Sequence, residues 1–213
     1  MPDCAPPIFS DQFRNDLFAL FKWRRDVRRF RRDPLRADTR DELIATANLA
    51  PSVGLSEPWR FVVVDDPVRR SAIRDCFEAC NADALRAQDE SRASLYARLK
   101  LAGLDEAPCQ LAVFADRGTQ KGHGLGRATM PETVEYSAVL AIHTLWLAAR
   151  ARGIGLGWVS ILDPQRVAEI LEVPADWTFV AYLCLGYPSE ESDVPALVRE
   201  GWETRDAVTL LHR

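Results

Sequence analysis

The sequence predicts a single α+β domain over residues 1–213, in which a sheet is covered by helices on both sides. Four strand-like segments alternate with helices of very different length, in an order that is not a regular βαβ repeat. The chain has 213 residues, and one core of this size buries roughly 70–75% of the unfolded surface without a disulfide or metal. The apolar fraction of 47% and the charged fraction of 27% exclude a collagen, a disordered chain and a disulfide scaffold.

The first part of the chain is expected to contain two helices, a strand and the start of a third helix. Residues 10–23 have the apolar spacing of an amphipathic helix, and Ser10 can cap its first turn. A second helix is expected to begin at Thr39, because a Thr followed three residues later by Glu matches a capping box. Residues 60–65 have the continuous apolar run of a buried strand, and Pro67 opens a helix that runs toward Cys80.

Residues 81–104 differ from the rest, because they favour a helix by propensity yet are polar almost all round. Such a segment is weakly held by its own packing, and we interpret it as a surface hairpin or as a lid over a site. The second half of the chain is expected to begin with a strand over residues 110–116 and a glycine-rich loop over 118–127. A long apolar helix should follow, from a capping box at Thr129 to just before Gly153. Strands over 154–160 and 178–187, with a short helix from Asp163 between them, should precede an extended arm over the last 25 residues.

The charge of the chain is uneven. Residues 22–40 hold nine basic and three acidic residues, a local excess of +6, so the net charge of -4 leaves -10 for the remainder. Such a stretch could bind nucleic acid, but it lacks interleaved stacking aromatics and a binding motif. We expect a small anionic ligand such as a phosphate, with a solvated charged face as the alternative.

The cysteines, histidines and glycines exclude several classes of site. The five cysteines form no C-x-x-C pair, so buried, inert thiols in a reducing cytoplasm are expected, in line with the lack of a signal peptide. The three histidines lack ligand spacing, and no metal site is expected. Neither glycine cluster matches G-x-G-x-x-G, so a Rossmann site is rejected. Gly155 and Gly157 are instead expected to let another group come close to the backbone of a strand, and a ligand is one candidate for that group. The longest apolar run, residues 139–149, is too short and too polar for a membrane span.

Two segments carry most of the chemical information. In RRDVRRF, at residues 24–30, several guanidinium groups can hold a phosphate by bidentate hydrogen bonds. Asp26 stands among them, either as a paired carboxylate or as a group aimed at a reacting centre. In APSVGLSEPW, at residues 50–59, Ser52 and a turn lie beside the first predicted strand.

These two segments resemble the motifs of the nitroreductase-like FMN-binding family, and the similarity extends along nearly the whole chain. In that family the first motif binds the flavin phosphate and ring, and the second lies along the isoalloxazine. The chain is more similar still to one branch, the 5,6-dimethylbenzimidazole synthases or flavin destructases. Asp26 stands where ordinary nitroreductases have Ser, and the blocks SLYARLKLAGLDEAP, GLGRATMPETVEYS and GWVSILDP also fit this branch. One departure is Glu57, where many relatives have Gln.

The resemblance implies a nitroreductase-like fold with a central mixed sheet, and a homodimer whose two FMN sites are each built from both chains. It implies that reduced FMN is a substrate rather than a recycled cofactor, with O2 as the second substrate and a separate flavin reductase as the source of FMNH2. The implied products are 5,6-dimethylbenzimidazole, the lower ligand of cobalamin, and erythrose 4-phosphate.

The resemblance also assigns roles to residues. Asp26 is expected to be the acid/base, and Ser160 a hydrogen-bonding group that steers the flavin. A lid over residues 81–104 would leave no room for a nicotinamide above the ring. Flavin contacts are expected from Arg24, Arg25, Asp26, Val27, Arg28, Ser52, Leu55, Leu101, Gly157, Ser160 and Arg205.

Two other functions remain compatible with the sequence. One is an ordinary NAD(P)H-dependent nitroreductase that keeps its FMN through many turnovers, and the other is a flavin-binding module without chemistry of its own. Asp26 together with the lid favours the synthase over both.

Overall fold

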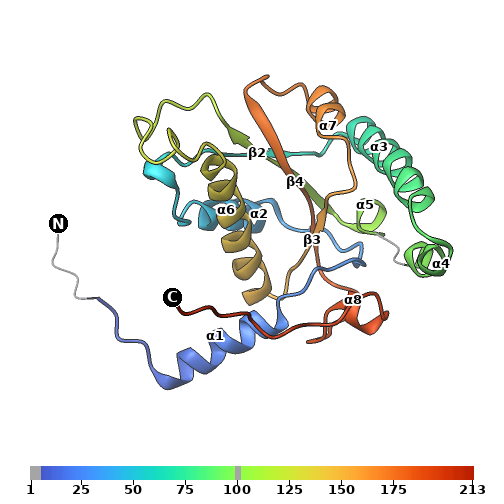
Figure 1. Ribbon diagram of the computed structural model, residues 1–213, viewed down its shortest axis with the longest axis horizontal. Helices are drawn as coiled ribbons and strands as arrows, with labels where there is room; N and C mark the ends of the chain where they lie inside the picture. The colour runs from blue at the N-terminus through green and yellow to red at the C-terminus, as the bar shows by residue number, and fades with distance from the viewer. Residues whose placement is uncertain (1–5, 99–101) are drawn as a thin grey trace.

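The computed structural model describes residues 6–98 and 102–213, and it contains a sheet between two layers of helices (Figure 1). The four predicted strands are confirmed, with ends that differ from the prediction by at most two residues. They are β1 (Trp59–Val63), β2 (Cys109–Asp116), β3 (Gly155–Val159) and β4 (Trp177–Gly186), arranged in the order β1-β2-β4-β3.

The expectation of a mixed sheet is wrong for these strands, because every neighbouring pair is antiparallel. The chain that leaves β1 re-enters the sheet at the end where it left, and so does the chain that leaves β3. The strand that follows, β2 or β4, therefore runs antiparallel to the one before it. A parallel contribution comes from an isolated bridge between Asp26 and Leu156. The segment that carries Asp26 thereby joins the sheet at its edge strand, β3.

Alternation along the strands gives the sheet an apolar core on each face. On β2, Leu111 and Val113 belong to one core, and Ala112 and Phe114 belong to the other. All four side chains are fully buried. The first face is covered by α2 (Ala37–Ala47) and α6 (Thr133–Ala151), and the second by α3 (Pro67–Arg86) and α7 (Pro164–Leu171) (Figure 1).

The long apolar helix α6 is confirmed, but its predicted capping box is not. The helix begins at Thr133, and its N-cap Glu132 makes no side-chain capping bond. The hydroxyl of Thr129 instead donates to the carbonyl of Gly126 at 3.2 Å, within the turns that precede the helix. At the other end Gly153 has a φ of +69°, and its N–H donates to Arg150, which confirms Gly153 as the residue that ends the helix.

Of the N-terminal caps predicted for the first two helices, one is confirmed and one is not. Helix α1 (Asp11–Trp23) is capped by Ser10, whose side chain accepts from the N–H of Phe13, as predicted. Helix α2 begins at Ala37 rather than at Thr39. The carboxylate of Asp38 accepts from the N–H of Thr39 at 2.7 Å, so an aspartate in the first turn replaces the predicted cap.

The predicted lid, residues 81–104, is helical but is not one unit. Helix α3 extends past Cys80 to Arg86, so the first part of the predicted lid belongs to a core helix. The rest contains α4 (Glu90–Arg98) and α5 (Gly103–Glu106), while residues 99–101, including Leu101, lie outside the described residues. At the C-terminus, α8 (Ala196–Arg199) is followed by an arm without regular structure, as expected.

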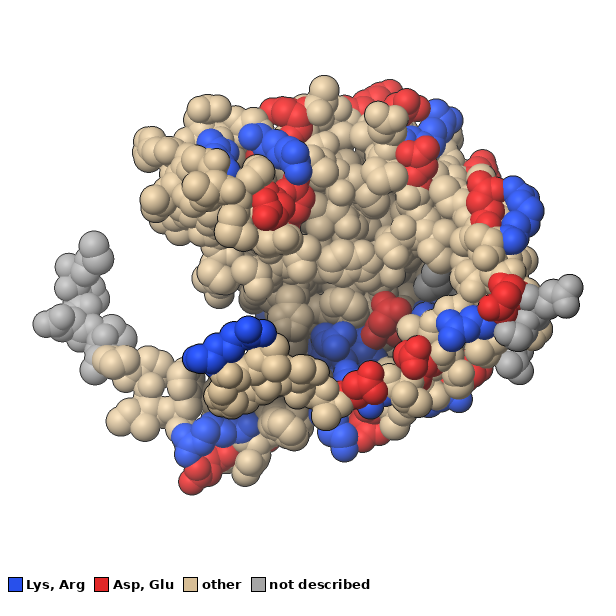
Figure 2. Space-filling model, in the orientation of Figure 1, with Lys and Arg blue, Asp and Glu red and all other residues tan. Residues whose placement is uncertain are grey.

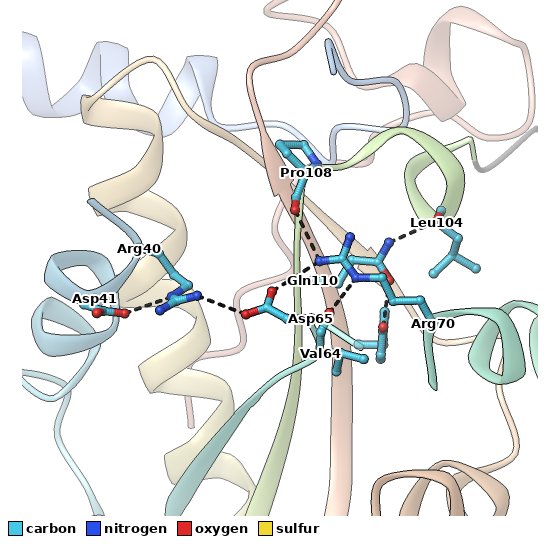
Figure 3. Close-up of polar contacts among 9 residues, drawn as sticks. Arg40, Asp41, Val64, Asp65, Arg70, Leu104, Pro108 and Gln110 are labelled. Atoms are coloured by element: carbon cyan, nitrogen blue, oxygen red, sulfur yellow. Dashed lines mark hydrogen bonds and ion pairs between the residues drawn. The ribbon is translucent and has the colours of Figure 1, made fainter. Parts of the chain in front are cut away.

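A polar network fixes the ends of β1 and β2 and reaches α5 (Figure 3). The guanidinium of Arg70 donates to the carbonyl of Pro108 at 3.2 Å and lies 3.5 Å from the carboxylate of Asp65. Gln110 donates to the carbonyl of Leu104 at 2.9 Å and accepts from the hydroxyl of Tyr182 at 2.7 Å. These bonds tie α5 to the core of the sheet.

The described cysteines are free thiols. Cys76, Cys109 and Cys184 are buried, as expected, and Cys80 is partly exposed. Burial raises the pKa of the Cys109 thiol to about 11, which keeps it protonated and unreactive. Within residues 6–98 and 102–213, no helix is long and apolar enough to cross a membrane, and no group of three or more His, Cys, Asp or Glu could hold a metal ion.

Candidate active site

The segment that follows α1 lies along β3. The N–H of Val27 donates to the carbonyl of Leu156 at 3.0 Å, and the indole of Trp146 on α6 donates to the carbonyl of Arg25 at 3.1 Å. A Cβ atom at Gly157 would lie 2.2 Å from the carbonyl oxygen of Val27. The predicted close approach at Gly157 is therefore made to this segment of the chain, and a larger residue would displace it.

Asp26 is bound to β3 through one of its two carboxylate oxygens. Oδ1 accepts from the N–H of Trp158 at 2.8 Å, and Oδ2 lies 3.7 Å from Nε of Arg28. Desolvation by the surrounding protein raises the pKa of the Asp26 carboxyl, although the Trp158 N–H and the charges of Arg28 and Arg24 act in the opposite direction. The side chain is still 38% exposed. A carboxyl with a raised pKa that remains open on one side can exchange a proton with a bound ligand.

The predicted arginines form a cationic cluster around this carboxyl. Burial lowers the pKa of Arg24, and the charge of Arg205 adds to that effect while Asp26 opposes it. The pKa of Arg25 is lowered by burial, by Arg24 and by Arg205. The Nε atoms of Arg25 and Arg28 are buried without a hydrogen-bond partner among the described residues. An anion placed in this cluster would relieve the repulsion between the guanidinium groups.

A cavity of about 140 Å³ opens beside the cluster. Residues 25–29 line one side of it, and Ser192, Ala196 and Glu200 line the other. Figure 2 shows that this face of the molecule is hollowed between the layer of α6 and the arm, with basic and acidic side chains next to one another in the hollow. The predicted anion site is therefore open to a ligand from this face.

A separate turn, η1 (Val53–Leu55), ends at Leu55 and is directly preceded by Ser52. The hydroxyl of Ser52 accepts from the N–H of Glu57 at 3.0 Å, so it stabilises the turn. Leu55 has a φ of +55° and is 68% exposed. The glycine-rich loop packs against this turn so closely that a Cβ at Gly122 would lie 2.5 Å from the carbonyl oxygen of Gly54.

One chain does not bring the two predicted halves of the site together. The N–H of Val53 in η1 donates to the hydroxyl of Ser137 near the start of α6, whereas Trp146 near its end bonds Arg25. These contacts are nine residues apart on one helix, which is about 14 Å along its axis. Ser52 and Leu55 therefore lie apart from the arginine cluster of the same chain.

The remaining predicted residues lie near the cluster or outside the described residues. Ser160 directly follows β3, two residues after the Trp158 that bonds Asp26, and it is exposed. Arg205 lies in the exposed arm, and its charge reaches Arg24 and Arg25. Leu101 falls in the part of the chain that is not described.

Three residues near the site were not predicted. Trp146 packs its ring under the guanidinium of Arg24, 4.7 Å from its centre. Glu106 on α5 accepts from the N–H of Phe30 at 2.9 Å, and the carbonyl of Asp193 accepts from Arg25 at 2.6 Å. The sequence gives a hint of Trp146, because it places an indole N–H on a helix that is otherwise apolar. It gives none for Glu106 and Asp193, because their partners, Phe30 and Arg25, lie far away along the chain.

Residues 21–187 match the model of the nitroreductase family, and the chain belongs to that family. It is 63% identical to a 5,6-dimethylbenzimidazole synthase of Rhodospirillum rubrum over 93% of this chain and 94% of that protein. It is 50% identical to a 5,6-dimethylbenzimidazole synthase of Rhodobacter capsulatus, over 92% and 94% of the two chains. The fold is similar to that of iodotyrosine deiodinase crystallised with FMN and 3-iodo-L-tyrosine, with a TM-score of 0.73, 23% identity and coverage of 92% and 98%.

The site fits the flavin mononucleotide that this family is expected to bind. Its phosphate requires cationic donors, and the chain supplies clustered guanidinium groups with buried nitrogen atoms that have no partner among the described residues. Asp26 adds a carboxyl at the place where the cluster meets β3. The residues present can therefore hold a phosphate-bearing ligand and place a proton-exchanging group beside it.

Proposed function

We propose that this protein is a 5,6-dimethylbenzimidazole synthase, which uses O2 to convert reduced FMN into 5,6-dimethylbenzimidazole and erythrose 4-phosphate. The benzimidazole is the lower ligand of cobalamin. The observation that carries the proposal is the position of Asp26, a partly desolvated carboxyl held on β3 among the arginines that we propose to bind the flavin. The 63% identity to the Rhodospirillum rubrum synthase over nearly the whole chain supports the same activity.

Reduced FMN, when bound, supplies the electrons for the reaction with O2 and the carbon atoms of the product. The cationic cluster of Arg24, Arg25, Arg28 and Arg205 would bind its phosphate. Asp26 would exchange protons through Oδ2, because Oδ1 is engaged by the N–H of Trp158. Ser160, at the end of β3, would donate or accept a hydrogen bond at the flavin ring.

A homodimer with shared sites is the second part of the proposal. Tyr136, Val139 and Leu140 lie on one face of α6 and are 54%, 40% and 44% exposed. Phe18 and Phe21 on α1 are 72% and 46% exposed. Apolar side chains exposed together on two helices are typical of an interface between subunits. A second copy placed on this surface could bring its Ser52 turn to the arginine cluster of the first.

Mixing two inactive variants tests the shared site. Arg24→Ala disables the phosphate half, and Ser52→Ala combined with Leu55→Gly disables the ring half. If each site uses both chains, co-expressed heterodimers contain one intact site and regain activity that neither homodimer has. Heterodimers as inactive as both parents would contradict the shared site.

The chain is also proposed to depend on a separate flavin reductase, and its free buried thiols favour the reducing cytoplasm. An ordinary nitroreductase would instead oxidise NADPH itself at the usual rates, about 1–10³ per second. The test is to add chemically reduced FMN and the protein to aerated buffer and to follow flavin absorbance. A yellow colour that fails to return in full supports the synthase, whereas full return, or rapid NADPH oxidation coupled to nitroaromatic reduction, overturns it.

A further inference from the structure

Within residues 199–213, Trp202 is half-buried and every other residue is exposed. From residue 203 to residue 213 every side chain is exposed, and Trp202 directly precedes this stretch. It is also three residues before Arg205, whose charge acts on Arg24 and Arg25. An indole held in place on such an arm indicates a specific contact.

The backbone fixes the direction of Trp202. Helix α8 ends at Arg199, and Gly201, two residues further on, has a φ of +73° and donates its N–H to the carbonyl of Val198 at 3.1 Å. The N–H of Trp202 donates to the carbonyl of Leu197 at 2.8 Å. This pair of bonds is the Schellman motif, in which the residue after the glycine is aimed back along the helix.

The indole contacts α4, the central helix of the predicted lid. Its ring lies 6.1 Å from the ring of Tyr96, at an interplanar angle of 58°, and 5.5 Å from the guanidinium of Arg92. Tyr96 also donates its hydroxyl to Asn81 on α3 at 2.9 Å. Helix α4 therefore contacts both α3 and the arm, and these contacts from other elements add to the weak packing expected of its own polar surface.

Arg205 lies on the same arm, and its positive charge lowers the pKa of Arg24 and of Arg25. Three residues span at most about 10 Å of extended chain, so fixing Arg205 also restricts where Trp202 can lie. A phosphate bound by Arg205 together with Arg24 and Arg25 would fix that end of the arm. The indole would then hold Tyr96 and Arg92, and with them α4, in one position.

We propose that Trp202 is a positioning residue that couples phosphate binding at Arg205 to the placement of α4 over the flavin. This inference rests on the proposed function. A flavin that carries its phosphate would close its own site through the arm, and the site would exclude bulk water only when the correct ligand is present. Riboflavin, which lacks the phosphate, would bind without holding α4.

Hydrogen exchange of the backbone amides in residues 90–98 tests the coupling without any chemistry, because oxidised FMN is the added ligand. In the wild type, saturating FMN is expected to slow exchange in α4 by about fivefold or more, a typical coupling between two sites. Saturating riboflavin should not. Trp202→Ala and Arg205→Ala should each abolish the slowing by FMN, while Trp202→Phe, which keeps a stacking ring, should retain most of it.

Val208→Ala is the matched control, since it removes an exposed apolar side chain from the same arm. If Trp202→Ala fails to fold, Arg92→Ala cuts the contact from the side of α4, and Tyr96→Phe keeps the ring and should preserve the coupling. In turnover, Trp202→Ala should convert less of the FMNH2 to benzimidazole and return more as intact oxidised FMN.

Unchanged FMN-dependent protection of α4 in Trp202→Ala and in Arg92→Ala would overturn the coupling. A wild type that forms no benzimidazole but shows this protection would instead overturn the proposed function and leave the coupling intact.

Discussion

Asp26 and Trp158 are joined by a hydrogen bond of 2.8 Å, in which the backbone N–H of β3 donates to one carboxylate oxygen. This bond favours the charged carboxylate, but desolvation outweighs it, and the pKa of Asp26 is raised. One side chain is thus both anchored to the sheet and prepared to hold a proton. The two properties can be separated by substitution, because the amide of asparagine keeps an oxygen that accepts the hydrogen bond but does not bind or release a proton.

Asp26→Asn is expected to keep flavin binding and to abolish benzimidazole formation. The amide oxygen can still accept from Trp158, so the segment should keep its place, but no proton can be exchanged at the former Oδ2. The measurements are FMN binding by fluorescence and product yield from FMNH2 in air. Asp33→Asn is the control, because Asp33 is an exposed carboxylate paired with Arg31 in the same stretch. A normal yield from Asp26→Asn would leave Asp26 as a structural partner of the arginines.

The raised pKa of Asp26 also predicts a pH-dependent effect on stability. The folded protein holds this proton more tightly than the unfolded chain, so the contribution of Asp26 is largest at low pH and is lost as the pH rises through the raised pKa. Asp26→Asn has no charge to desolvate. It should therefore be more stable than the wild type at about pH 7, and the gain should fade toward about pH 3.

Urea denaturation at both pH values measures this difference. Asp33→Asn should behave in the opposite way, with a small loss at neutral pH, because Arg31 lowers the pKa of Asp33. If Asp26→Asn gains the same stability at both pH values, the claim that desolvation raises the pKa of Asp26 is contradicted.

Ser160→Ala should reduce the rate of product formation more than it weakens FMN binding. Loss of one neutral hydrogen bond changes binding by about 0.5–1.5 kcal/mol, whereas loss of a group that stabilises developing charge can lower a rate by about 10²–10³-fold. Single-turnover product formation and FMN titration separate the two effects. Unchanged turnover would mean that Ser160 does no more than end β3.

Gly157→Ala should damage both stability and the site. The added Cβ would lie 2.2 Å from the carbonyl oxygen of Val27, so the segment that carries Asp26 must move away from β3. Overpacking of this kind lowers the free energy of unfolding by about 1–3 kcal/mol. Thermal unfolding and FMN titration check the prediction, and a variant that matches the wild type in both would show that this contact is not required.

The sequence predicted elements whose signals are local. Ser10 caps α1 and Asp163 caps α7, because each side chain accepts from N–H groups two or three residues away. Gly153 ends α6 for an equally local reason, its positive φ. The capping boxes at Thr39 and Thr129 failed because other hydrogen bonds formed there instead: the N–H of Thr39 donates to Asp38, and the hydroxyl of Thr129 donates to the carbonyl of Gly126.

The candidate site was predicted in part. Its basic and acidic residues follow from RRDVRRF and from the resemblance that this motif carries. The contacts that give them their chemistry do not, since Trp158 lies 132 residues from Asp26 along the chain. The contact between Trp202 and Tyr96 likewise joins two segments that show no common pattern in the sequence. Burial and long-range packing decide such pairs.

The central claim is that this protein consumes the flavin itself. The most direct test is mass spectrometry of the products after a limited amount of FMNH2 reacts with air in the presence of excess protein and no other enzyme. The account predicts 5,6-dimethylbenzimidazole in proportion to the FMN lost, and its absence with Asp26→Asn. Complete recovery of the flavin as intact oxidised FMN, with no benzimidazole, would contradict it.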